Sequence, residues 1–416
     1  MSKKEYSTRQ ELENEKFTYQ YYISGSDQIW NYAIKDFDYA YMLDFVNEGK
    51  KISYAASLGP IKRKILPEQE KRIIMKVSVV ILNWNGCDML RTFLPSVVRY
   101  SEGEGIEVCV ADNGSTDASV TLLQQEFPSV RTIVLDQNYG FADGYNLALQ
   151  QVDAEYVVLL NSDVEVTEHW LEPMIAYLDK HPEVAACQPK IRSQRQKEYF
   201  EYAGAAGGFI DKYGYPFCRG RIMGVVEKDE GQYDTVIPVF WATGAALFIR
   251  RADYVNVGGL DGRFFAHMEE IDLCWRLRSR NREIVCVPQS IVYHVGGATL
   301  KKENPHKTFL NFRNNLVMLY KNLPQEELNK VMRIRICLDY LAAFNFLLQG
   351  HWDNASAVMR ARKEYKRLCP SFSLSREENM RKKTLNPIPE RTKNSILWQF
   401  YARGCKRFSQ LSDLKG

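Results

Sequence analysis

The amino-acid sequence predicts an α/β fold built on a doubly wound, mostly parallel sheet between residues 75 and 300. Short apolar, β-branched segments alternate with helical segments, a pattern typical of strands and helices in α/β proteins. The first such segment, Val77–Leu82, is apolar almost throughout, as expected of a strand that is buried on both faces. Each segment is followed by a polar loop. Together these observations favour a sheet with ligand-binding loops at one edge.

Composition narrows the class of protein. The chain has 416 residues, enough for two or three domains, and its net charge of +4 does not favour a nucleic-acid partner. Its nine cysteines include no CxxC pair, which argues against a disulfide framework or zinc knuckle and for a reducing compartment. The first residues lack the apolar core of a signal peptide, and no segment has the clean apolar length of a membrane span. We therefore expect a cytoplasmic protein.

Residues 1–74 differ in character from the rest of the chain. The segments Tyr21–Asn31 and Lys51–Gly59 are typical of short strands that end in small-residue turns. With Tyr41–Val46 between them, they resemble a piece of the polysaccharide pyruvyl transferase family. Most of that family's length is missing, so pyruvyl transfer is not inferred. A charged linker follows, and Met75 opens a new strand. We expect residues 1–74 to be a fused fragment.

Polar residues follow four predicted strands in turn. The strands and the loops that end them are 77–82 with Asn83–Gly86, 106–111 with Asp112–Asp117, 132–135 with Asn138–Phe141, and 156–160 with Asn161–Asp163. A helix is expected over 88–100, between the first two strands. Ligands of doubly wound sheets bind at the carboxyl ends of the strands. The four loops together therefore predict a ligand site at this edge.

The common nucleotide fingerprints are missing from these loops. Neither GxGxxG nor the phosphate-binding GxxxxGK[ST] motif follows the first strand, which disfavours dinucleotide oxidoreductases and P-loop enzymes. Asp112 and Asn113 have the polar groups to bind a base or ribose. The same residues also suit a turn and a helix cap. Both interpretations stay open from the residues alone.

An acidic cluster stands out further along the chain. Glu269, Glu270 and Asp272 lie at the start of a predicted helix that begins near Met268 and buries Ile271, Cys274, Trp275 and Leu277. Asp272 and Arg276 have the spacing of an ion pair on one helix face. Acids are also favoured in the first helical turn because they meet the positive end of the helix dipole. The cluster is thus either a helix-start feature or a catalytic one.

Several motifs, in this order, resemble the family-2 glycosyltransferases of the GT-A fold. They are VVILNWNG at 79–86, DNGSTD at 112–117, NYGFADGYN at 138–146, LNSDV at 160–164, GAALFIRR at 244–251, GLD at 259–261 and the acidic cluster. Within the family the chain is similar to rhamnosyl- and galactofuranosyltransferase-like members, which act on cell-surface glycans. The resemblance implies a nucleotide-sugar donor.

The resemblance also implies roles for individual residues. Asp163 corresponds to the last acid of the metal-binding DxD motif, and His294 to a histidine that completes the site, with Mn²⁺ or Mg²⁺ as cofactor. Asn161 replaces the first acid, and an uncharged oxygen ligand weakens metal affinity. A lone histidine is more often structural, and only its family position favours a ligand. The donor nucleotide is expected to contact Asn83, Asn85, Asp112, Asn113, Asn138, Gly140, Asn146 and Asn161.

The chemistry requires a base and an acceptor site as well. An acceptor hydroxyl needs a carboxylate to take its proton, and a cation stabilises the leaving diphosphate. By resemblance the base is Glu270, where relatives have Asp, with Glu269 and Asp272 hydrogen-bonding the acceptor or a loop. Trp241 lies where relatives face the acceptor, and Gly244 would allow close backbone approach.

Residues 301–416 are predicted to be helical and basic. Ile334, Leu338, Leu341, Phe344 and Leu348 recur at helical spacing, with Arg335 and Asp339 off that stripe, and basic residues interleave with aromatic ones after residue 360. One interpretation is peripheral contact with the inner face of the cell membrane. The other is a helical subdomain with a solvated basic face.

The sequence therefore predicts an inverting, metal-dependent glycosyltransferase. It would move a sugar from a UDP-sugar or dTDP-rhamnose to a surface polysaccharide or lipid-linked glycan. A non-catalytic sugar-nucleotide-binding scaffold is the alternative, motivated by Asn161 and by the N-terminal fragment. A nucleotidyltransferase is a third class, but its glycine-rich signature is missing. The sugar, the acceptor linkage and the oligomeric state stay open.

Overall fold

The computed structural model describes residues 21–25, 50–54, 75–296 and 304–412. The chain divides into two compact units, Met1–Ile73 and Ile74–Gly416. In the first unit the described residues form β1 (Tyr21–Gly25) and β2 (Lys50–Tyr54), which pair in parallel. The rest of the segment that resembles pyruvyl transferases lies outside the described residues.

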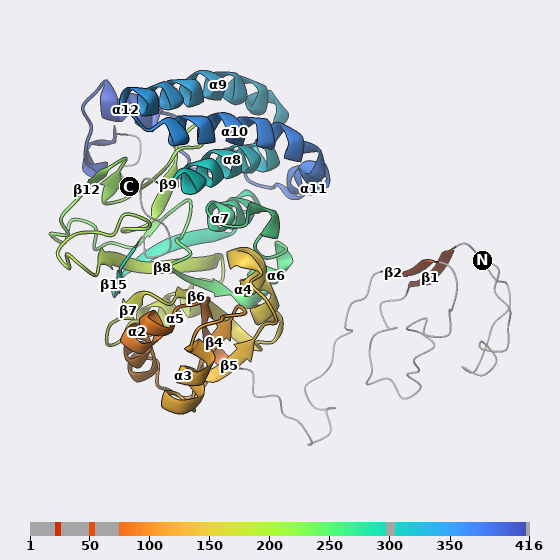
Figure 1. Ribbon diagram of the computed structural model, residues 1–416, viewed down its shortest axis with the longest axis vertical. Coiled ribbons are helices and arrows are strands. Elements are labelled where there is room, and N and C mark those ends of the chain that lie inside the picture. Colours follow the sequence, from red (N-terminus) through yellow and green to blue (C-terminus); the bar gives the residue numbers. More distant parts are fainter. Residues whose placement is uncertain (1–20, 26–49, 55–74, 297–303, 413–416) are drawn as a thin grey trace. The chain divides into compact units, whose positions relative to one another are not determined.

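A nine-stranded sheet forms the centre of this unit (Figure 1). One half is parallel and has the order β5 (Arg131–Val134), β4 (Ile106–Asp112), β3 (Met75–Asn83), β6 (Ala154–Asn161). The other half is mixed, because β14 (Ala246–Arg250) runs antiparallel to both β6 and β8 (Val184–Ser193). The long strand β15 (Glu283–His294) lies parallel to β8 and pairs at the edge with β13 (Ile237–Pro238). The predicted α/β fold is confirmed, with all four predicted strands in place.

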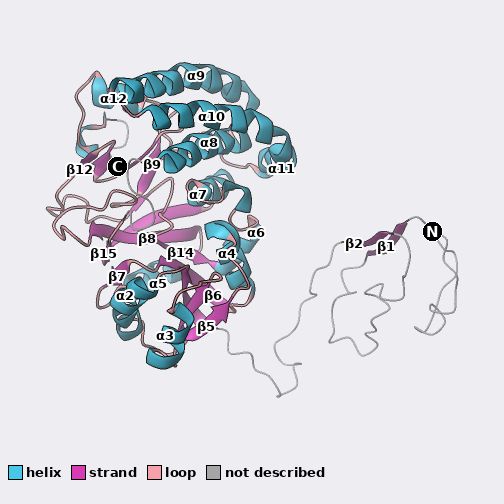
Figure 2. Ribbon diagram, viewed as in Figure 1, coloured by secondary structure: helices cyan, strands magenta, loops and turns pink. Residues whose placement is uncertain are grey.

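Helices cover both faces of the sheet (Figure 2). Each face of the sheet has its own apolar core, and alternate residues of β3 point into them. Val77, Val79 and Ile81 pack into the first core, and Val80 packs into the second. The first core contains residues of α2 (Cys87–Tyr100), α3 (Ser119–Glu126) and α5 (Glu172–Lys180). The second contains residues of α4 (Gly140–Gln150), α6 (Arg251–Asn256) and α7 (Glu269–Ser279). Because helices cover both faces of these strands, their sequences are continuous apolar runs.

The segment between β8 and β14 adds a small antiparallel sheet. Its strands are β9 (Gly208–Ile210), β10 (Pro216–Cys218), β11 (Arg221–Ile222) and β12 (Val225–Val226). The short strand β7 (Val164–Val166) pairs instead with the end of β15, where Val164 stands opposite His294. This pairing brings two residues from distant parts of the chain, Asp163 and His294, to one place.

The C-terminal region is helical, as predicted. Its helices are α8 (Pro305–Asn322), α9 (Gln325–Leu348), α10 (Trp352–Leu368), α11 (Ser373–Lys382) and α12 (Ile396–Tyr401), with the short 3-10 helices η3 (Cys369–Phe372) and η4 (Phe408–Gln410). Together with η2 (Gly262–Phe264), α7 joins these helices to the sheet, and α8, α9 and α10 stack beyond it (Figure 1). The boundary predicted at residue 300 does not separate a compact unit, because the second unit runs to Gly416. Among the described residues, no helix has both the length and the apolar character needed to cross a bilayer.

Candidate active site

Three of the four polar loops are tied to one another by their own side chains. Asn83 and Asp112 stand opposite each other in the pairing of β3 with β4, and the Asn83 amide donates to the Asp112 carboxylate at 3.0 Å. The other Asp112 oxygen accepts from the Ser115 backbone at 2.9 Å. Asn85 accepts from the Thr116 backbone at 2.7 Å and so joins the first loop to the second. Asn83 and Asp112 are buried, so they shape the loops from within.

Asn113 ties the second loop to the third in the same way. Its amide nitrogen donates to Asn138 and to the Gly140 carbonyl at 3.1 and 3.0 Å, and its oxygen accepts from the Tyr139 backbone at 3.0 Å. A positive φ of 74° at Gly140 lets α4 begin there. Trp84, Asn85, Thr116 and Asn138 face solvent at the edge these ties define. A donor nucleotide would meet this edge.

Asn146 does not belong to this edge. Its side chain hydrogen-bonds Leu260 through both backbone groups and accepts from the Tyr254 hydroxyl at 2.7 Å. These contacts fasten α4 to the turn after α6. The sequence-based expectation that Asn146 contacts the nucleotide is therefore replaced by a structural role.

Asp163, His294 and Asn161 meet at the carboxyl end of β6. Asp163 Oδ1 lies 3.1 Å from His294 Nε2, and Asn161 Nδ2 lies 3.5 Å from the same nitrogen. On the other side of the ring, Nδ1 lies 3.6 Å from Glu201, an ion-pair distance just beyond a hydrogen bond. Although burial opposes it, pairing with Asp163 and Glu201 raises the pKa of His294 to about 10. The same pairing lowers the pKa of Asp163 against the effect of its burial.

This arrangement fits a divalent cation. Among the described residues no cluster offers three or more His, Cys, Asp or Glu ligands, but Asp163 and His294 supply one oxygen and one nitrogen side by side. The Asn161 carbonyl is a third donor of the kind such ions accept. Glu201 behind the ring matches the carboxylate that commonly orients a metal-bound histidine. Since His294 must lose its proton to bind a metal, cation binding would release that proton.

Glu269 and Glu270 open helix α7 as two neighbouring enclosed carboxylates. One oxygen of each makes no hydrogen bond within the described part of the chain. Burial raises the pKa of both, and the Glu270 charge raises the pKa of Glu269 further. Glu269 is 4% exposed whereas Glu270 keeps partial contact with solvent, so Glu270 is the one that ionises first. Unpartnered carboxylates with raised pKa values mark a functional site.

Contacts around Gly244 connect Glu270 to the segment that contains Asn161 and Asp163. A Cβ placed at Gly244 would lie 3.8 Å from the Glu270 Cβ and 3.1 Å from the Phe141 ring, so a side chain there would crowd Phe141. The next residue, Ala245, accepts from the Asn161 backbone at 3.0 Å. The predicted base and the predicted metal site thus lie on neighbouring backbone segments.

The loop before Glu269 is strained and firmly held. Phe265, His267 and Met268 have φ values of 68°, 70° and 75°, a region that non-glycine residues rarely adopt. The buried Asn314 amide of α8 donates to the carbonyls of Phe264, Ala266 and His267 at 2.9, 2.8 and 2.8 Å. Strained backbone persists where surrounding contacts determine it, and it gathers at active sites. Asn314 therefore fixes the start of α7 and the position of Glu270.

Two other predicted site residues are structural. Asp272 is fully buried and pairs with Arg276 at 2.9 Å and Lys321 at 2.7 Å, and its second oxygen accepts from Asn322 at 2.8 Å. Its oxygens are thus occupied by α7 and α8, not by an acceptor. Trp241 is 3% exposed, and its indole donates to the Phe209 carbonyl at 3.0 Å. It packs beneath Gly208 rather than facing an acceptor.

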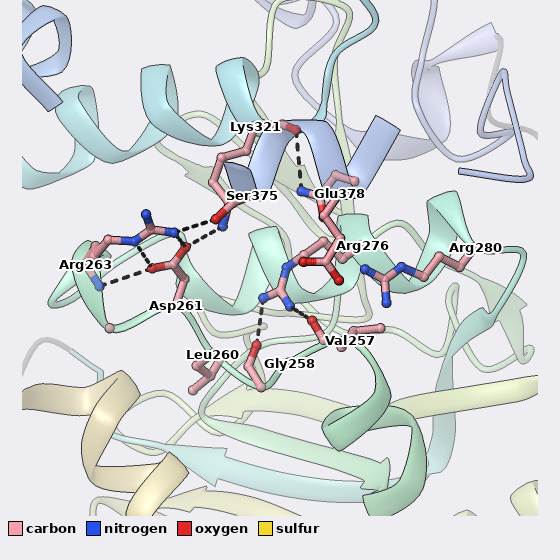
Figure 3. A pocket seen from close by; sticks show the side chains of 13 residues that line it. Val257, Gly258, Leu260, Asp261, Arg263, Arg276, Arg280, Lys321, Ser375 and Glu378 are labelled. Atoms are coloured by element: carbon pink, nitrogen blue, oxygen red, sulfur yellow. Dashed lines mark hydrogen bonds and ion pairs between the residues drawn. The ribbon is translucent and has the colours of Figure 1, made fainter. Parts of the chain in front are cut away.

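A cavity of about 290 Å³ lies behind the other end of α7 (Figure 3). Its cationic side chains already have partners: Arg263 and Lys321 bind Asp261, and Arg276 donates to the carbonyls of Val257 and Gly259. These pairs hold the Asp261 carboxylate ionised, with its pKa well below the usual range. The cavity is a junction between α7, α8 and α11 and not the site of the chemistry.

Sequence reasoning missed Glu201 and Asn314. Glu201 lies between β8 and the small antiparallel sheet and is buried behind His294. Asn314 follows Arg313 in the segment FRNN of α8. The run of polar residues in an otherwise apolar stretch of α8 was the available signal.

Comparison with known proteins bears on the class of this protein. Residues 78–244 match the model of the family described as glycosyl transferase family 2. Over these residues the chain matches that family, and the family resemblance drawn from the sequence motifs is confirmed. The matched segment ends before Glu270 and His294.

Two of the relatives are named as rhamnosyltransferases. An N-acetylglucosaminyl-diphospho-decaprenol L-rhamnosyltransferase of Mycobacterium tuberculosis is 27% identical over 230 residues, which cover 52% of this chain and 75% of the relative. Rhamnosyltransferase WbbL of Escherichia coli is 26% identical over 38% of this chain and 61% of its own length. Among solved structures, GalNAc-T7 with UDP, GalNAc and Mn²⁺ aligns with 78% of this chain and 60% of its own, at 15% identity and a TM-score of 0.48.

Proposed function

We propose that this protein is an inverting glycosyltransferase that moves a sugar, rhamnose or a hexose, from a nucleotide-diphosphate donor to a surface polysaccharide or lipid-linked glycan. The observation that supports this most is the position of Glu270, whose carboxylate has one unpartnered oxygen: it packs against Gly244, and the next residue, Ala245, accepts from the backbone of Asn161 beside the Asp163–His294 pair. The rhamnosyltransferase relatives motivate the donor and acceptor classes.

In this proposal Glu270 is the general base. Its ionised carboxylate takes the proton of the acceptor hydroxyl while the hydroxyl oxygen attacks the anomeric carbon from the face opposite the leaving group. The bond from that carbon to the diphosphate oxygen breaks, and the nucleoside diphosphate leaves. Burial and the Glu270 charge raise the pKa of Glu269, which favours its neutral form beside the base. The interlocked loops position the nucleotide without rearranging.

Asp163 and His294 would hold a divalent cation, with Asn161 as a third ligand. When bound, Mn²⁺ or Mg²⁺ supplies positive charge for the leaving diphosphate. The residues themselves do the positioning: Glu201 orients the His294 ring, and the pairing of β7 with β15 sets the distance between the two ligands.

The test is release of nucleoside diphosphate from a panel of sugar nucleotides, with Mn²⁺, with Mg²⁺ and with chelator. Wild-type protein is expected to release it in a metal-dependent manner, and Asp163→Ala to lose about 100-fold or more, because the lost charge stabilisation is worth several kcal/mol. Glu165→Ala is the matched control, since that carboxylate lies two residues away and pairs with Lys197 at the surface. Equal rates in Asp163→Ala and wild type would contradict the proposal.

A non-catalytic sugar-nucleotide-binding scaffold is the second candidate, favoured by Asn161 in place of an acid. The same panel separates the two. Donor binding by calorimetry without release of nucleoside diphosphate, across all donors and both metals, would identify the scaffold.

We further propose that residues 1–73 are dispensable for transfer. They form a unit of their own, and every group in the proposed reaction lies after residue 75. A chain that begins at Ile74 is expected to keep its kcat within about twofold, since substitutions and deletions that touch no site contact usually have small effects. A large loss of kcat in the truncated protein, with unchanged thermal unfolding, would show that the first unit takes part.

A further inference from the structure

Helix α9 has two charged residues turned inward, Arg335 and Asp339. Arg335 and Asp339 are buried and pair with each other at 3.1 Å, and Arg362 of α10 also pairs with Asp339. Arg335 donates in addition to the Tyr213 carbonyl at 2.9 Å and to Asn315 of α8. This buried polar network fixes which face of α9 points to the protein, and it leaves the apolar stripe on the other face.

The outward face of α9 is apolar. Leu341, Phe344 and Leu348 are 63%, 55% and 70% exposed, although their spacing is typical of a packing stripe. The apolar surface continues past the turn at 349–351 to Trp352, which is 69% exposed. We call this surface the apolar tip, and its residues are Ile336, Tyr340, Leu341, Phe344, Leu347, Leu348, Trp352 and Met359. Contiguous exposed apolar surfaces mark interaction sites.

The same two helices carry exposed basic residues at their other ends. They are Lys330 and Arg333 near the start of α9, and Arg360, Lys363 and Lys366 towards the end of α10. Three residues join the helices, so these run antiparallel and their basic ends lie together, away from the tip. The hairpin is therefore mainly apolar at its turn, where Asp353 is the exposed acid beside Trp352, and mainly basic at its open end, where Glu326 is the exposed acid at the start of α9.

We propose that the α9–α10 hairpin docks on an anionic membrane surface. Its charge gradient fits this partner: apolar side chains enter the boundary between headgroups and acyl chains, while Lys and Arg stay at the level of anionic headgroups. Tyr340 and Trp352 have the amphipathic rings that are enriched at such interfaces. The docking is separate from the transfer reaction, and it would hold the enzyme where a lipid-linked acceptor is found.

Flotation of the full-length protein with vesicles tests the proposal. The wild type is expected to float with vesicles of phosphatidylcholine mixed with phosphatidylglycerol, and less with phosphatidylcholine alone. Phe344→Ser with Leu348→Ser should lower the partition coefficient at least about tenfold, because apolar burial drives the insertion. Lys363→Glu with Lys366→Glu should remove the preference for anionic vesicles. Leu374→Ser is the matched control, as Leu374 of α11 is 79% exposed but lies outside the tip, and it should float like the wild type.

Two results would overturn the proposal. One is wild-type protein that stays at the bottom of the gradient with both vesicle types. The other is a concentration-dependent dimer in sedimentation that Phe344→Ser with Leu348→Ser converts to monomer while vesicle binding is unchanged, since the tip would then bind a second copy. Thermal unfolding by circular dichroism shows that each variant is folded. No sugar donor is used, so failure here leaves the proposed transfer reaction untouched.

Discussion

Glu270→Gln is expected to lower kcat by about 10²–10⁴-fold while donor binding stays within about twofold, because only proton removal from the acceptor is lost. The amide has the shape of the carboxyl group but cannot accept a proton. Transfer to an acceptor glycan and donor affinity by calorimetry are the two measurements. Wild-type turnover in this variant would refute the assignment of the base.

The neighbouring glutamate supplies the matched comparison. Since burial and the Glu270 charge raise the pKa of Glu269 well above its usual range, Gln at 269 mimics the protonated form that this shift favours, and Glu269→Gln should lose far less than Glu270→Gln. A raised pKa also sets a direction for pH: the base is ionised only above that pKa, so the acid limb of kcat/KM should lie above the usual value for Glu, about 4.3. If Glu269→Gln lost more activity than Glu270→Gln, Glu269 would be the base and Glu270 its neutral neighbour.

Asn314→Ala is expected to lower kcat by about 10–100-fold with little change in donor affinity. The reason is that displacing a catalytic group by about 1 Å can lower the reaction rate about 100-fold. The substitution removes the amide donor from the carbonyls of Phe264, Ala266 and His267, of which Phe264 keeps the Arg313 guanidinium and the Ala266 backbone as donors. Losing that buried donor also costs stability, about 1–3 kcal/mol. Steady-state kinetics and thermal unfolding together measure both effects.

The isosteric Asn314→Asp variant sharpens this prediction. It keeps the size of the side chain but offers acceptors to three carbonyl oxygens, so it should be worse than Asn314→Ala in both kcat and stability. Asn329→Ala, at an exposed position on α9 that accepts from Gln325, is the control. If the Asp variant turned over like the wild type, the loop would not depend on Asn314.

The parallel half of the sheet could be predicted because its strands are short apolar runs bounded by polar turns. The start of α7 was predictable for a similar reason, since its acids and apolar residues have helical spacing. The antiparallel direction of β14 was not predictable, because the sequence of a buried strand does not show whether it pairs in parallel or antiparallel. Its direction depends on pairing with β6 and β8, which lie far away in the chain.

The candidate site was predictable in its location and less so in its roles. Asn83, Asp112 and Asn113 do lie at the sheet edge, but their side chains bind one another. Polar residues at a loop look alike in sequence whether they hold a ligand or a neighbouring loop. Asp272 shows the same ambiguity: its partners Lys321 and Asn322 lie 49 and 50 residues further on, beyond the reach of any local pattern.

A short series of contacts connects the buried polar residues of α9 to the loop before Glu270. Arg335 holds Asn315, and the adjacent Asn314 holds the backbone before Glu270. The segment matched by the family ends at residue 244, so these parts would be left behind if that segment were exchanged between relatives. A chimera that keeps activity is therefore expected to take the donor loops, α7, α8, α9 and α10 from the same parent. A chimera joined near residue 244 is expected to fold but to lose the contacts that position Glu270, the proposed base.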